Sequence, residues 1–158
     1  MGQAVSTSKR LLKADPEQVW QVWANPKSYA EWVIGAQEVR GVDGVWPRPG
    51  SSFHHKAGCW PLQSRDSTSV IASSAPRQLV LEARFRPFGI ARIELAVRPE
   101  GGASLVEMKE TTVGPPLAKL ATPLFSLLYA ARNKASLRRL DEMVARGGGG
   151  RPQVGIGE

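Results

Sequence analysis

The sequence is poor in cysteine and histidine, which excludes several kinds of site. A single cysteine, Cys59, leaves no partner for an intramolecular disulfide or a cysteine-based zinc cage. The only histidines, His54 and His55, are neighbours that a strand would point to opposite faces, so an ordinary zinc site is not expected. No GxGxxG or Walker A loop accompanies a strand and helix. We therefore expect no metal and no cofactor.

Long apolar runs are also missing. No stretch of about 20 apolar residues could span a membrane, and residues 1–16 hold no apolar run of signal-peptide length. Together with the single cysteine, this favours a cytoplasmic protein. The chain has 158 residues, the size of one domain, and its last residues are rich in glycine. We predict one ligand-binding domain over residues 1–146 and a flexible tail over 147–158.

Basic residues outnumber acidic ones without forming a recognisable nucleic-acid motif. The counts are 21 Lys and Arg against 14 Asp and Glu, for a formal net charge of +7. The basic residues are scattered, and only those between 132 and 139 approach a cluster. We expect a solvated basic surface and no nucleic-acid partner, with weak contact to anionic membranes as an alternative.

The first third of the chain indicates one strand followed by two short helices. A strand is predicted near residues 5–14. Asp15 can cap the following helix, Pro16 suits its first position, and Gln18 can complete a capping box. That helix should end near Ala24. Asn25 and Pro26 then repeat the start signal for a second helix that ends near residue 32.

Six segments rich in branched and aromatic residues follow, separated by glycine and proline. Such short connections join antiparallel neighbours. The predicted strands cover 36–42, 51–59, 62–73, 77–86, 90–98 and 103–113.

A long helical segment is predicted from about Leu117 to Ala145. Its apolar stripe changes side partway along, and Pro123 lies near the change. We predict a break or bend between residues 121 and 129, so that residues 117–128 form an apolar gate. The later stripe, which includes Asn133 and Leu137, should pack on the sheet.

Strand alternation places a mostly apolar set of side chains on one sheet face, opposite this helix. We expect that face and the helix to enclose a ligand cavity. The candidate ligand-binding residues are Phe53, His55, Asp66, Thr68, Leu81, Ala83, Phe85, Ile93, Leu95, Met108, Glu110, Tyr129, Asn133 and Leu137.

His55 and Asp66 are the candidate catalytic pair. A symmetric hairpin centred between residues 60 and 61 would set them opposite one another, with Cβ atoms about 5 Å apart. The carboxylate would then orient the imidazole and favour its charged form, as a general acid or base requires. The alternative is that the two groups only satisfy each other or add polarity to the cavity.

Three other polar residues have two interpretations each. Glu110 lies near a strand end, where it could be solvated or could contact ligand. Tyr129 and Asn133 lie one turn apart on the inward helix face, where they could bind ligand polar groups or bond to sheet edges and water.

The order of one strand, two helices, six strands and a long helix resembles the START-related helix-grip superfamily. This is the polyketide cyclase/dehydratase and lipid-transport (SRPBCC) superfamily, which includes the birch-pollen-allergen-like proteins. The resemblance covers about residues 5–145 and is carried by segments 14–20, 25–32, 50–55, 76–83 and 133–140. It implies an α+β fold in which a curved seven-stranded antiparallel sheet wraps round the C-terminal helix.

The resemblance also implies a hydrophobic small molecule or lipid between sheet and helix. We therefore predict binding of such a molecule as the function. The first alternative is a polyketide cyclase/dehydratase-like enzyme that uses His55 as acid or base. The second is a membrane-surface lipid carrier. Family members share no universal catalytic motif, and the chain could be a monomer or a homodimer.

Overall fold

The computed structural model describes residues 3–59, 62–85, 89–113 and 123–147. Seven strands and three α-helices fill these ranges, with a 3₁₀ turn, η1 (Pro26–Ser28), before the second helix. The helices are α1 (Pro16–Trp23), α2 (Tyr29–Trp32) and α3 (Pro123–Ala145). The strands are β1 (Gln3–Leu12), β2 (Ala36–Asp43), β3 (Ser52–Cys59), β4 (Leu62–Ser74), β5 (Gln78–Phe85), β6 (Gly89–Glu100) and β7 (Ala103–Val113).

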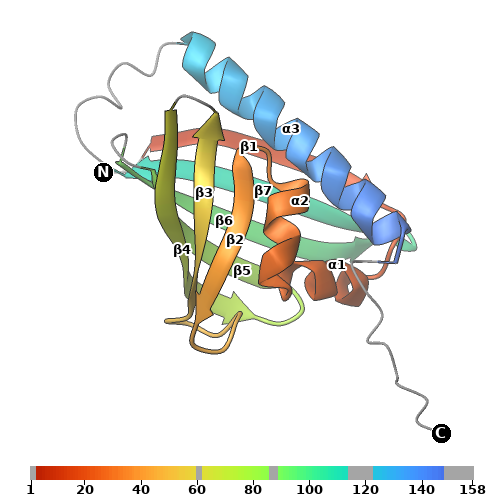
Figure 1. The fold of residues 1–158 in the computed structure, drawn as a ribbon. Coiled ribbons are helices and arrows are strands. Elements are labelled where there is room, and N and C mark those ends of the chain that lie inside the picture. Colours follow the sequence, from red (N-terminus) through yellow and green to blue (C-terminus); the bar gives the residue numbers. More distant parts are fainter. Residues whose placement is uncertain (1–2, 60–61, 86–88, 114–122, 148–158) are drawn as a thin grey trace, which may run out of the picture.

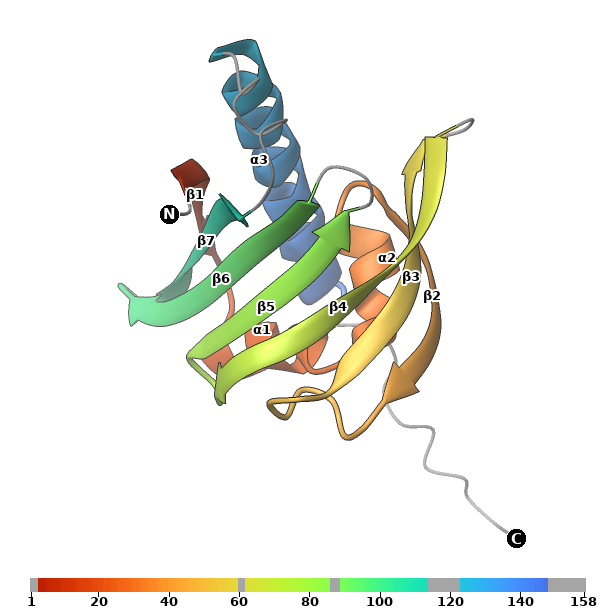
Figure 2. The ribbon, with the colours of Figure 1, turned by 90° about the vertical axis from the view of Figure 1, so that its left-hand side faces the viewer.

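The strands form one antiparallel sheet in the order β1-β7-β6-β5-β4-β3-β2. Strands β2 to β7 follow the chain, and β1 joins the far edge beside β7. The sheet curves round the helices (Figure 2), while α3 runs along its concave side near β1 and α1 and α2 cover the other end (Figure 1). This is the predicted α+β helix-grip architecture, which is therefore confirmed.

The signals at the helix starts act largely as the sequence predicts. The Asp15 amide donates to Gln18 Oε1 over 2.9 Å, which forms one half of a capping box. Pro16 is the first residue of α1. Before α2, the Asn25 side-chain oxygen accepts from the Lys27 amide over 3.1 Å. These contacts fix the path of the chain from β1 into the helices that close one end of the sheet.

The expected strand boundaries differ from the structure by at most two residues, whereas the expected helix break does not occur. The first strand spans Gln3–Leu12, earlier than the predicted 5–14. The predicted break inside the C-terminal helix is wrong for residues 123–129, since α3 runs without interruption from Pro123 to Ala145. Proline is accommodated at a helix start, where its missing N–H would be unbonded anyway. Residues 117–122 of the predicted gate lie outside the described residues, as do 148–158 of the predicted tail.

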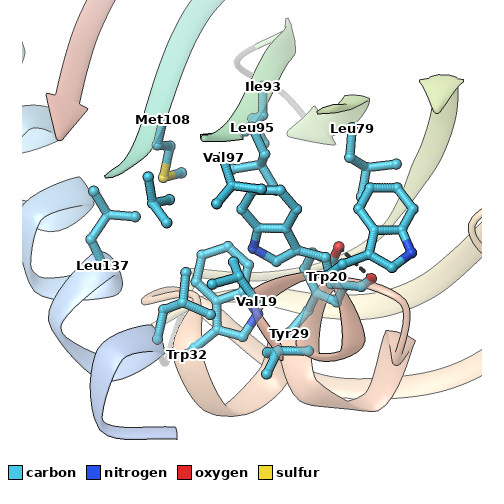
Figure 3. Packing of buried hydrophobic residues seen from close by; sticks show 14 of the residues in the cluster. Val19, Trp20, Tyr29, Trp32, Leu79, Ile93, Leu95, Val97, Met108 and Leu137 are labelled. Carbon is cyan, nitrogen blue, oxygen red and sulfur yellow. Dashed lines mark hydrogen bonds between the residues drawn. The ribbon is translucent and has the colours of Figure 1, made fainter. Parts of the chain in front are cut away.

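The alternation of buried side chains follows the prediction along the described strands. Figure 3 shows Leu79 of β5, Ile93, Leu95 and Val97 of β6 and Met108 of β7 pointing toward the helices. Trp32 and Leu137 meet them from α2 and α3. Because one sheet face faces solvent, a shift of one residue in register would expose this entire set.

The C-terminal half of α3 holds the helix to the sheet. Its predicted stripe is buried at Asn133, Leu137, Leu140 and Val144. The Arg10 guanidinium on β1 also donates to Asp141 over 2.8 Å. Of the described side chains in the helix before Asn133, none is buried, and Leu127 and Leu128 are exposed. The two halves of α3 are therefore packed very differently.

None of the described helices is both long and apolar enough to cross a bilayer.

Candidate functional site

A small cavity lies between the concave face of the sheet, α2 and the middle of α3. Its volume is about 40 Å³, enough for a few waters. Strands β3 to β7 contribute eight residues to the wall: Phe53, His55, Thr68, Leu81, Ala83, Ile93, Leu95 and Met108. The rest of the wall comes from Tyr29, Trp32, Val33 and Gly35 in and after α2, from Ala36 at the start of β2, and from Arg132 of α3. All eight of these strand residues are among the candidates that alternation selected.

His55 is the titratable group on the sheet side of the cavity wall. Its ring Nε2 lies 2.9 Å from the Thr68 hydroxyl on β4, and the residue is only 5% exposed. Burial lowers the pKa of His55 below its ordinary value of 6.5, although the nearby Asp66 carboxylate opposes this shift. The neutral ring is therefore favoured, in contrast to the charged form that the sequence led us to expect.

Asp66 occupies the predicted register but not the predicted position in the site. His55 and Asp66 are directly paired across β3 and β4, as the symmetric hairpin requires. However, the hydrogen bond described for the His55 ring runs to Thr68. Asp66 is buried and does not line the cavity. Its influence on His55 in this arrangement is electrostatic.

The lowered pKa of His55 predicts a loss of stability in mild acid. Between the native pKa and the unfolded value near 6.5, the unfolded chain binds more protons, so stability decreases as pH falls through this window. Urea unfolding between about pH 8 and pH 5 measures this slope. His55→Asn should reduce the slope by up to one proton, or about 1.4 kcal/mol per pH unit. An unchanged slope in the variant would contradict a buried neutral imidazole.

Glu110 is fully buried, so of its two interpretations the solvated strand end is wrong. It faces α3, where the Asn133 amide donates to Glu110 Oε2 over 3.0 Å and the Arg132 guanidinium lies 3.5 Å from the same atom. Strand β1 forms the sheet edge beside β7, and its residue Ser6 is the cross-strand partner of Glu110. The carboxylate therefore joins sheet to helix beside the cavity, without lining it.

The remaining candidates lie near the cavity or outside the described side chains. Tyr129 is half-buried, with the Arg132 guanidinium 5.6 Å from its ring centre. Burial raises the pKa of Tyr129, and the charge of Glu110 raises it further. Leu137 is buried in the core, and neither it nor Asn133 lines the cavity. The side chain of Phe85 is not among those that the structure describes.

The candidate residues selected from the sequence did not include the part of the wall formed by α2 and Arg132. The Tyr29 ring centre lies 5.4 Å from that of Trp32 and 5.1 Å from that of Phe53, and the Phe53 ring lies 5.4 Å from His55. These rings form a continuous aromatic wall beside the imidazole. The spacing of Tyr29 and Trp32, three residues apart on a short helix, was the signal that could have identified this wall.

Arg132 joins α3 to the chain just after α2. Its Nε donates to the Ile34 carbonyl over 2.8 Å, and the Ile34 amide donates to Ser136 Oγ over 3.1 Å. Both backbone groups of Ile34 are thus bonded to α3 side chains. We call this contact between Ile34 and the side chains of Arg132 and Ser136 the seam. The seam lies beside the cavity, because Val33 and Arg132 both line the cavity.

Comparisons with solved structures show the same fold at low sequence identity. Ara h 8.0201 has a TM-score of 0.69 at 12% identity, with coverage of 92% of this chain and 99% of that chain. NE0264 from Nitrosomonas europaea has a TM-score of 0.68 at 14% identity, covering 89% and 94%. TTHA0849 from Thermus thermophilus has a TM-score of 0.66 at 17% identity, covering 89% and 96%.

A comparison with curated proteins gives no match. A sequence model of the family described as polyketide cyclase/dehydrase and lipid transport matches residues 3–145. The match spans every strand and helix described above, and it confirms the resemblance that the order of elements indicated. The chain therefore belongs to the polyketide cyclase/dehydrase and lipid transport family.

Proposed function

We propose that the cavity between the sheet, α2 and Arg132 binds an apolar or aromatic small molecule. The observation that carries this proposal is the composition of the wall, which is aliphatic and aromatic apart from His55, Thr68 and Arg132. In such pockets, apolar burial supplies affinity and a few polar groups supply orientation. Membership of the family supports hydrophobic ligand binding in general.

The polar groups restrict the chemistry of the ligand. The Arg132 guanidinium can only donate hydrogen bonds, so it suits a carbonyl, hydroxyl or carboxylate oxygen. His55 Nδ1 has no hydrogen-bond partner among the described residues and is available to a second polar group. We therefore expect a mainly apolar molecule that carries an oxygen at the Arg132 end.

The cavity must widen before it accepts such a molecule. Its volume of about 40 Å³ is far below the roughly 300–1,000 Å³ of ordinary ligand pockets. We expect the cavity to open between α3 and Ile34, where two hydrogen bonds would have to break. In addition, no described side chain of α3 before Asn133 is buried.

Titration with a neutral apolar fluorophore, N-phenyl-1-naphthylamine, tests the proposal. Ala83→Phe adds a ring to a buried cavity position and should weaken probe binding at least about tenfold, because the added ring occupies the space for the ligand. Ala72→Phe places the same ring at an exposed position of β4 and should leave binding within about twofold. Equal affinities in both variants would contradict binding in the cavity.

Acid–base catalysis at the same cavity is the second candidate function. The observation that favours it is the neutral His55 ring in the cavity wall, which can accept a proton from a carbonyl substrate. The Thr68 hydroxyl would position the ring. His55→Asn should then abolish turnover of a polyketide-like substrate while probe binding persists. If probe binding is lost to the same extent as turnover, His55 contacts the ligand and does not act as an acid or base.

A further inference from the structure

A second hollow lies on the outer face of the sheet, on the opposite side from the cavity. Its volume is about 260 Å³, and it crosses β2, β3, β4 and β5. Arg40, Arg65 and Arg84 border it together with His54 and Ser67. In Figure 2 this outer face of β4 and β5 is turned toward the viewer, with α1 and α2 behind it. We call this feature the arginine hollow.

Strand register explains why these side chains meet. Gly41 pairs with His54, and His54 pairs with Ser67, so the three lie in one row across the sheet. The pairing of Thr68 with Ala83 brings Arg84 to the end of this row. A Cβ added at Gly41 would meet no atom within 4 Å. The row therefore has open space above Gly41, which carries no side chain. The neighbouring arginines come from three strands, β2, β4 and β5.

Positive charge in the hollow is only partly compensated. Among the described residues, neither Arg65 nor Arg84 forms an ion pair, and both are exposed. Arg40 shares Glu38 with Lys56, at 3.5 and 3.4 Å. The like charges of Arg65 and Arg84, which have no such carboxylate partner among the described residues, repel each other, so an anion in the hollow would stabilise the arrangement.

Besides Glu38, two further carboxylates near the hollow do not supply that anion. The Asp43 carboxylate lies 2.7 Å from His54 Nε2 and is mostly exposed. Asp66 also borders the hollow, but it is buried and its side chain alternates to the concave side with His55. The outward-facing side chains that line the hollow are therefore the three arginines, His54 and Ser67.

We propose that the arginine hollow binds a phosphate group. A guanidinium presents a planar fork of donors that matches phosphate oxygens, and several forks on one group give strong charge-assisted hydrogen bonds. The Ser67 hydroxyl adds a neutral donor beside them. The phosphate could belong to a soluble metabolite or to the headgroup of a phosphomonoester lipid, since both present the same dianion. The hollow borders His55, which also lines the apolar cavity, but its arginines and Ser67 are absent from the cavity wall.

Titration of ¹⁵N-labelled protein with pyrophosphate, at an ionic strength held constant with sodium chloride, tests this site. Wild type should show saturable amide shifts at Arg65, Ser67 and Arg84 with a Kd of about 1 mM or lower. Arg65→Gln with Arg84→Gln should weaken binding at least about tenfold. The matched control, Arg98→Gln with Arg138→Gln, removes the same charge at exposed positions elsewhere and should change the Kd less than about twofold.

A vesicle arm distinguishes the two sources of phosphate. Phosphatidylcholine vesicles with phosphatidic acid are compared with vesicles that carry equal charge as phosphatidylserine. Capture by phosphatidic acid alone, lost in the Arg65/Arg84 variant, would support the site and assign it to lipid. Saturable pyrophosphate binding without vesicle capture would support it and assign it to a soluble ligand. Absence of saturable pyrophosphate binding, or equal weakening in the control variant, would overturn the proposal.

Discussion

Arg132→Met should destabilise the protein by about 3–5 kcal/mol. The substitution removes the cation that lies 3.5 Å from the fully buried Glu110 carboxylate. Among the described residues, the Asn133 amide then remains as the hydrogen-bond donor to that carboxylate. Breaking one side of a buried ion pair costs this much, because the remaining charge is desolvated without compensation. The Ile34 carbonyl also loses its hydrogen bond from Nε. Urea unfolding at neutral pH measures the change.

A second substitution separates the charge effect from lost packing. Glu110→Gln in the Arg132→Met background removes the uncompensated charge, so it should recover about half of the loss. Arg138→Met changes an exposed arginine on the same helix and should stay within about 0.5 kcal/mol. If Glu110→Gln adds a further loss in place of a recovery, the loss in Arg132→Met does not come from an uncompensated buried charge.

Trp32→Ala should cost about 3–5 kcal/mol, whereas Trp32→Phe should cost about 1 kcal/mol. Trp32 is 1% exposed and forms part of the cavity wall. Removal of a buried ring loses its transfer free energy and leaves a void. Phenylalanine keeps most of the packing and also removes the buried indole N–H, which has no hydrogen-bond partner among the described residues.

The same pair of variants reports on the cavity. Trp32→Ala enlarges the cavity beside Tyr29, so N-phenyl-1-naphthylamine should bind more tightly than in wild type if the variant stays folded. Trp32→Phe should alter the probe affinity much less. Equal stabilities for the two variants, within about 0.5 kcal/mol, would contradict the tight packing described for α2.

The sheet was predictable in detail because strand signals are local and have a period of two. The buried face followed from alternation at positions such as Leu81 and Met108. The pairing of His55 with Asp66 followed from a short symmetric hairpin, in which the turn fixes the register. Capping at Asp15 likewise depends on contacts within four residues.

The parts of the site that depend on long-range packing were not predictable in this way. The burial of Glu110 results from β1 and α3, which come from opposite ends of the chain. Alternation placed His55 on the inner face, but it could not show that its hydrogen bond runs to Thr68. The spacing of Tyr29 and Trp32 shows only that they share one face of a short helix, whereas their meeting with Arg132 at the cavity depends on how two helices dock over the sheet.

Intermolecular NOEs between bound N-phenyl-1-naphthylamine and ¹³C-labelled methyl groups test the central claim most directly. The cavity places methyl groups of Leu81, Ile93 and Met108 in its wall, so these should show NOEs to the aromatic protons of the probe. The exposed methyl groups of Leu127 and Leu128 should show none. NOEs confined to Leu127 and Leu128, with none at the three cavity residues, would mean surface binding and would contradict an internal ligand site.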